Sequence, residues 1–173
     1  KAMYCIINNT AIMEMASASG LTLISPEERN PLHTTSFGVG EMIKDAIIRG
    51  CRRFIVGIGG SAINDGGLGM LSALGFEFLD KNNTPVPCGA TGLELLSEIR
   101  TDNVIPGLKE CVFNIACDVI NPLCGNNGCS AVYGKQKGAT PEMIKDMDAW
   151  LKNYSEIVKT LFDGANPESE GAG

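Results

Sequence analysis

An apolar run at residues 54–58 lies between two segments with helical periodicity, and this order allows few folds. Before the run, residues 39–49 carry apolar side chains on one helical face and are followed by Gly50, a helix-ending residue. After it, residues 68–74 carry leucines at helical spacing and are followed by Gly75. A short apolar run without alternation is typical of a strand buried on both faces. The order predicts an α/β fold, with a mixed or mostly parallel sheet and helices on its faces.

Three further segments support this prediction. Two apolar runs around Asn8 and Asn9 predict a hairpin. Residues 111–119, "CVFNIACDV", predict another buried strand, within which Cys117 is expected to be a small buried hydrophobe. Residues 141–162 carry an apolar stripe at helical spacing, with Thr140 as the expected N-cap.

Composition limits the partners. With 173 residues, 44% of them hydrophobic, the chain is expected to form a single α/β domain over residues 1–173. The net charge of −6 argues against binding to nucleic acid or an anionic membrane, since both are bound mainly through clustered Lys and Arg. There is no apolar run of about 20 residues and no signal-peptide pattern, so no membrane partner is expected. Seven cysteines without a CxxC pair predict reduced thiols in a cytoplasmic protein.

The stretch "VGIGGSAINDGG", residues 56–67, is the first candidate for a site. It lacks the lysine of a Walker A loop and the last glycine of the Rossmann fingerprint. It places Ser61, Asn64 and Asp65 where a strand passes into a helix, a position that favours an anion, and Asp65 could also hold a metal ion. Asn64 or Asp65 could equally be only the N-cap of the helix.

A second polar cluster follows the next predicted strand, in "ACDVINPLCGNNG". Asp118 comes directly after the apolar run, and the carboxyl ends of parallel strands are where ligand sites form. A carboxylate leaving a strand core needs a partner or a ligand, so we expect Asp118 to be functional. Asn121 precedes a proline, and its alternative role is a chain reversal.

The remaining polar residues are less specific. Thr35 or Ser36 is expected to cap the helix that follows, and His33 is assigned no role. Glu14 lies on a predicted strand and points either to solvent or into a site at the strand end. Lys137 lies in a glycine-bounded turn, where lysines are usually solvated but can also neutralise phosphate.

Five stretches together resemble the glycerate kinase family of bacterial type, in this order and along nearly the whole chain. They are "EMASASGL", "RNPLHTTSFGVGEMI", "VGIGGSAINDGGLGMLSALG", "ACDVINPL" and "GKQKGA". The resemblance implies transfer of the ATP γ-phosphoryl group to D-glycerate, giving phosphoglycerate and ADP, in an enzyme of two α/β domains. It implies Mg2+ as the cofactor, with ATP as co-substrate.

The resemblance also implies site residues. Substrate or phosphate contacts fall on Gly59, Gly60, Ser61, Asn64, Gly66, Asn121, Glu14, Ser19 and Lys137. Asp65 and Asp118 are the implied catalytic carboxylates, and one of them is expected to orient the glycerate hydroxyl or bind Mg2+. Ile63 and Ile120 stand where the family often has Thr, so no hydroxyl contact is expected at those two positions.

Members of the family resemble each other over about twice this length. They begin with an "APDSxK"-type segment and carry a "GEGRxD"-type segment near the far end, neither of which is present. The chain is therefore expected to be the second α/β domain of the enzyme. Its partners are then glycerate, ATP and the absent N- and C-terminal portion of the same chain, without which it is expected to be inactive. A non-catalytic small-anion-binding or regulatory module is the alternative.

Overall fold

The computed structural model describes residues 1–173 and has a four-stranded sheet in the order β1-β2-β3-β6. The strands are β1 (Cys5–Ile7), β2 (Thr10–Glu14), β3 (Arg53–Gly57) and β6 (Val112–Ala116). β1 pairs antiparallel with β2, whereas β2 with β3 and β3 with β6 are parallel. The predicted α/β fold with a mixed sheet is confirmed.

The turn between β1 and β2 explains how the antiparallel strand joins this sheet. Asn8 and Asn9 both have positive φ, 48° and 60°. Tight hairpin turns need two residues in this left-handed region, and asparagine tolerates it better than most side chains. The predicted hairpin is therefore confirmed, together with the reason for its two asparagines.

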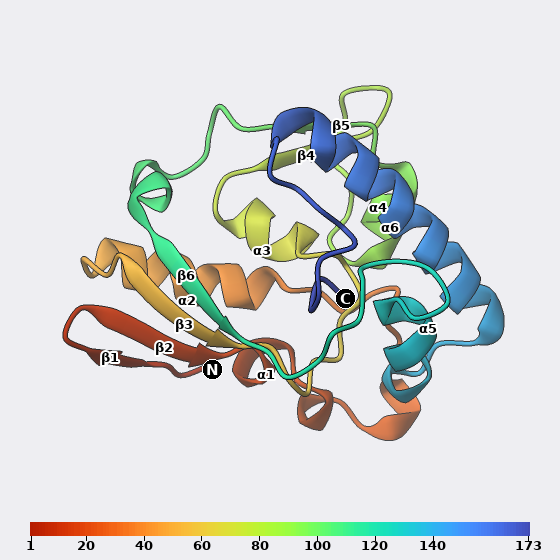
Figure 1. Ribbon diagram of the computed structural model, residues 1–173, viewed down its shortest axis with the longest axis horizontal. Helices are drawn as coiled ribbons and strands as arrows, with labels where there is room; N and C mark the ends of the chain where they lie inside the picture. Colours follow the sequence, from red (N-terminus) through yellow and green to blue (C-terminus); the bar gives the residue numbers. More distant parts are fainter.

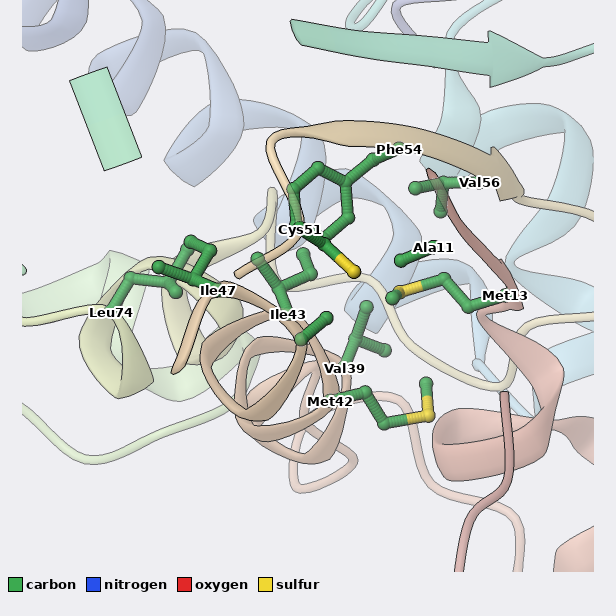
Figure 2. Close-up of a cluster of buried hydrophobic side chains, with 11 residues drawn as sticks. Ala11, Met13, Val39, Met42, Ile43, Ile47, Cys51, Phe54, Val56 and Leu74 are labelled. Carbon is green, nitrogen blue, oxygen red and sulfur yellow. The ribbon is translucent and has the colours of Figure 1, made fainter. Parts of the chain in front are cut away.

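One face of the sheet is covered by helix α2 (Phe37–Ile48), which connects the parallel strands β2 and β3 (Figure 1). The helix ends before Gly50, whose φ is +93°. Figure 2 shows apolar side chains of α2 meeting those of β2 and β3 in one buried cluster. Its members are Ala11, Met13, Val39, Met42, Ile43, Ala46, Ile47, Cys51, Phe54, Val56 and Leu74.

The rest of the chain forms a second apolar cluster on the far side of α2. Helix α3 (Leu68–Ala73) links the two clusters, since Leu68 belongs to the second and Leu74, just after the helix, to the first. The second cluster also includes side chains of the hairpin β4 (Glu77–Leu79) and β5 (Glu98–Arg100), of α4 (Ala90–Leu95), α5 (Cys129–Tyr133) and α6 (Pro141–Leu161). The short helices are α1 (Ala16–Ser19), η1 (Leu21–Leu23), η2 (Pro26–Glu28), η3 (Pro106–Glu110) and η4 (Lys135–Lys137).

Helix α6 begins as its sequence predicts. The Thr140 side chain accepts a hydrogen bond from the main-chain N–H of Met143 at 3.3 Å, and Pro141 opens the first turn. Leu151 and Tyr154 are buried from its apolar stripe. Neither α6 nor any other helix of the structure combines the length and apolar character that crossing a membrane requires.

Strand β6 differs from its prediction. It was expected to be buried, but all five of its residues are exposed, and so is Cys117, which follows it. β6 is the last strand of the sheet, and α2 covers only the face that carries Phe54 and Val56. Apolar composition predicted the strand correctly, but it could not show that β6 lies at an uncovered edge.

Candidate functional site

A cavity of about 400 Å3 lies where β3 and β6 end. The loop after β3 forms one part of the wall, the loop after β6 forms another, and the segment from α5 to η4 contributes a third. The carboxyl ends of neighbouring parallel strands are the usual place for ligands in open α/β sheets. The position of this cavity therefore follows from the topology.

Eight of the eleven predicted site residues line this cavity. They are Gly59, Gly60, Ser61, Asn64, Asp65, Gly66, Asp118 and Lys137. Residues 59–66 follow β3, Asp118 follows β6 two residues after its last residue, and Lys137 ends η4. The structure thus brings together three segments that are far apart in the sequence.

The other three predicted residues do not line the cavity. Glu14 is exposed at the end of β2, and its carboxylate lies over Gly57, where a Cβ would collide with it. The Ser19 hydroxyl donates to the carbonyl oxygen of Thr35 at 3.0 Å. The main-chain N–H of Ala62, in the loop after β3, donates to the Ser19 carbonyl oxygen at 2.8 Å. Glu14 and Ser19 therefore support the end of β3 and the loop that follows it.

Asn121 has both ends of its amide bonded within the protein. Its Nδ2 donates to the carbonyl oxygen of Asn127 at 2.8 Å, and its Oδ1 accepts from the Tyr133 hydroxyl at 2.6 Å. These bonds close the loop after β6 and tie it to α5. These bonds agree with the chain-reversing role that was its alternative and add a link to Tyr133.

The glycine loop presents free hydrogen-bond donors to the cavity. The main-chain N–H groups of Gly59, Gly60 and Ser61 donate no hydrogen bond within the protein, and neither does the Ser61 hydroxyl. Gly60 has φ +69°, a conformation that glycine adopts without strain. Consecutive free N–H groups in such a turn are suited to the oxygens of a carboxylate or phosphate.

Asp65 is fully buried, and its carboxylate is bonded to two helix starts. Its Oδ2 accepts from the main-chain N–H and the hydroxyl of Ser36, both at 2.8 Å, and from the N–H of Gly69 at 3.2 Å. Its Oδ1 accepts from the N–H of Gly67 at 3.0 Å. Ser36 is the N-cap of α2, and Gly69 lies in the first turn of α3. The side chain joins the two helices, which is an extended form of the capping role that the sequence left open.

The start of α3 is consequently closed to an external anion. The N–H of Leu68 donates to the Asp65 carbonyl oxygen, that of Gly69 to the Asp65 carboxylate, and that of Met70 to the Ser36 hydroxyl. The sequence left open either an anion or a capping side chain at this helix start, and the bonds of its donors to Asp65 and Ser36 favour the capping role. Free main-chain donors lie earlier in the loop, among them those of residues 59–61.

Lys137 is a buried cation with a single hydrogen bond. Its side chain is 6% exposed, and Nζ donates to the carbonyl oxygen of Ile63 at 2.6 Å. It forms none of the ion pairs of the structure, although the Tyr133 ring lies 5.9 Å from Nζ. Burial lowers the pKa of Lys137 below its ordinary value, against the opposing effects of Cys129 and Asp65. An anion bound in the cavity would stabilise an ammonium group in this position.

Asn64 and Asp118 supply the acceptors of the site. Asn64 Nδ2 donates to the hydroxyl of Ser130 at 2.8 Å, while its Oδ1 is buried without a partner. The Asp118 side chain is exposed at the cavity and accepts no hydrogen bond within the protein. No group of three or more His, Cys, Asp or Glu side chains comes together as a metal site.

Tyr133 and Ser130 belong to the surroundings of the site but were not found from the sequence. Tyr133 lines the cavity, and Ser130 lies fully buried behind Asn64. The spacing of four residues between Tyr133 and Lys137 is a helical signal that could have pointed to their contact. No local signal marks Ser130, because it meets Asn64 across 66 positions of sequence.

Together, the fold and the cavity define an α/β protein with a cavity at the carboxyl ends of its parallel strands, lined by free main-chain donors and a buried lysine. A family model described as the glycerate kinase family matches residues 1–173. The chain belongs to the glycerate kinase family.

Individual relatives agree with this assignment. The chain is 51% identical to a glycerate kinase of Haemophilus influenzae and 46% identical to a glycerate 2-kinase of Escherichia coli, each over 95% of this chain and 43% of the relative. A crystal structure from Salmonella typhimurium LT2, described as a candidate glycerate kinase 2, is similar with a TM-score of 0.96 at 43% identity. It matches over 99% of this chain and 46% of that one. The chain thus spans less than half the length of the relatives it matches.

Proposed function

We propose that this chain forms the acceptor-binding part of a glycerate kinase, which transfers the γ-phosphoryl group of ATP to D-glycerate. The observation that carries the proposal is the buried Lys137 ammonium, which has no anionic partner and lines a cavity with the free N–H groups of residues 59–61. Glycerate and the transferred phosphoryl group are both anionic, and both would find donors in this cavity. The non-catalytic alternative is not favoured, because the similar curated relatives include proteins named as glycerate kinases.

The positions of the residues lead us to assign them separate roles in the proposed reaction. The N–H groups of residues 59–61 and the Lys137 ammonium would bind anionic oxygens and offset the charge that moves during transfer. Asp118 would be the catalytic carboxylate, because it faces the cavity without a partner while Asp65 is bonded to helix starts. Phosphoryl transfer depends mainly on positioning and charge stabilisation, which are what this set of groups can provide.

The family implies Mg2+, and Asp118 fits this ion as a single oxygen donor. Mg2+ in kinase sites is commonly held by one or two carboxylates together with substrate phosphates and water, so a cluster of three acidic residues is not required. When bound, the ion would neutralise charge on the ATP phosphates. We therefore assign the proposed metal contact to Asp118 and not to Asp65, whose lone pairs are engaged by Ser36, Gly67 and Gly69.

We further propose that the remainder of a full-length family member packs on the uncovered face of the sheet. Ile12 and Ile55 are neighbours in register on that face and are 36% and 38% exposed. Val112 lies on the same face at the free edge and is 58% exposed. An apolar face of this kind is a sign of an interface. The relatives have more than enough additional chain to cover it, since the match spans only 43% of them.

All seven cysteines are unpaired in the structure. This is the state expected in a reducing compartment, and it supports a cytoplasmic location as part of the proposal.

The proposal is tested by glycerate-dependent ADP formation in the full-length protein that carries these residues. We expect turnover with D-glycerate, ATP and Mg2+, and a loss of about a thousandfold in kcat/KM in Lys137→Met. Lys135→Met is the matched control, because Lys135 is exposed two residues away in the same turn. Folded wild-type protein without glycerate-dependent ADP formation would overturn the proposal. Turnover by the isolated 173 residues would overturn its two-domain part.

A further inference from the structure

Asn64 carries a hydrogen-bond acceptor that no group of the protein uses. Its side chain is 5% exposed and lines the cavity. The amide nitrogen is bonded to the Ser130 hydroxyl, whereas Oδ1 has no partner. Buried acceptors are rarely left unpaired in proteins, because the protein then loses hydration without gaining a bond. The position of Oδ1 therefore points to a ligand group that can donate a hydrogen.

The surrounding donors do not supply that hydrogen. Lys137 Nζ is bonded to the Ile63 carbonyl oxygen, and the free N–H groups of residues 59–61 are suited to anionic oxygens. An ionised carboxylate or phosphate carries no hydrogen to donate, so the anionic end of a ligand leaves Asn64 Oδ1 unsatisfied. A hydroxyl group can donate to it.

We propose that Asn64 Oδ1 accepts a hydrogen bond from a hydroxyl of the phosphoryl acceptor, and that Ser130 is the positioning residue that holds the amide in this orientation. This inference rests on the proposed function and adds the source of selectivity for hydroxylated acids. Ser130 is fully buried in α5 and does not line the cavity, so it acts on the ligand only through Asn64. Without its hydroxyl oxygen, the amide nitrogen of Asn64 loses its one hydrogen-bond partner in the protein.

The test compares three ligands in the full-length enzyme: D-glycerate, lactate and 3-hydroxypropionate. Each of the last two lacks one hydroxyl of glycerate. We expect Ser130→Ala to raise the Kd of D-glycerate about tenfold, and to change the Kd of the analogue without the contacted hydroxyl by less than about twofold. Ser155→Ala is the matched control, because Ser155 is also buried but donates to the Lys152 carbonyl oxygen on α6. It should leave all three Kd values unchanged.

A merely structural role for Ser130 gives a different result. Equal weakening of all three ligands by Ser130→Ala, or no weakening of glycerate, would overturn the inference while leaving glycerate kinase activity in place. If Ser130→Ala does not fold, Asn64→Ala removes the acceptor Oδ1 itself and should abolish the preference for glycerate over the analogue that lacks the contacted hydroxyl. A wild-type enzyme that neither binds nor phosphorylates glycerate would overturn the proposed function, and this inference with it.

Discussion

Replacing Asp65 by Asn is expected to act mainly on the free energy of unfolding, and less on kcat. The amide keeps one oxygen, which can retain the three shorter hydrogen bonds of Oδ2, from the N–H and hydroxyl of Ser36 and the N–H of Gly69, but its NH2 group would then face the N–H of Gly67. Hydrogen bonds to a charged group contribute about 1.5–3 kcal/mol and those to a neutral group about 0.5–1.5 kcal/mol, so each of the three weakens by about 1 kcal/mol. The unpaired donor at Gly67 costs about 1–3 kcal/mol more. The sum is a loss of roughly 4–6 kcal/mol, a large part of a typical folding free energy.

The measurement is urea unfolding of the full-length protein followed by circular dichroism, with Asp118→Asn as the matched comparison. Asp118 is exposed and accepts no hydrogen bond, so its substitution should change the free energy of unfolding by less than about 0.5 kcal/mol while reducing kcat strongly. The reasoning is refuted if Asp65→Asn unfolds like the wild type and loses turnover at least as severely as Asp118→Asn. Asp65 would then be the catalytic carboxylate that the family resemblance implied.

Three further predictions follow from burial and packing. Burial lowers the pKa of Lys137 below 10.5, so the KM for glycerate should rise as the pH rises through that lowered pKa and the ammonium loses its charge. The free energy of unfolding of the ligand-free protein should increase over the same pH range, because Lys137 loses its proton at a lower pH in the folded state than in the unfolded state. A KM that stays constant as the pH rises toward 10.5 would contradict this. Gly69→Ala should lower the free energy of unfolding in urea by about 1–3 kcal/mol, since the new Cβ would lie 2.7 Å from the Phe37 nitrogen. Gly164→Ala is the control and should change this free energy little, because the space around Gly164 is open. Ile55→Asp should lower the melting temperature of the full-length protein by several degrees although Ile55 is 38% exposed here, and an unchanged value would mean that this sheet face stays open.

The elements that the sequence predicted well are those defined by local spacing. Helix α2 followed from four apolar residues on one face and from Gly50, and helix α6 from its stripe and Thr140. The hairpin followed from its two asparagines. These signals are short-range, because a helix face, a cap and a turn each depend on residues within a few positions of one another.

The strand β6 and the roles of site residues depended on neighbours that local patterns do not contain. An apolar run has the same sequence pattern in a central strand and in an edge strand, so the sequence did not predict that β6 and Cys117 are exposed. Asp65 has the same local appearance as a cap or as a ligand, and only its bonds to Ser36, 29 positions away, separate the two. Ser130 became visible only through its contact with Asn64.

The most direct test of the central claim is a crystal structure of the full-length protein with D-glycerate bound. We predict glycerate in the cavity at the ends of β3 and β6, with its anionic oxygens on the N–H groups of residues 59–61 or on Lys137. We also predict an Asp65 carboxylate that stays bonded to Ser36 and Gly69. Glycerate bound elsewhere, with Lys137 still bonded only to Ile63, would contradict it.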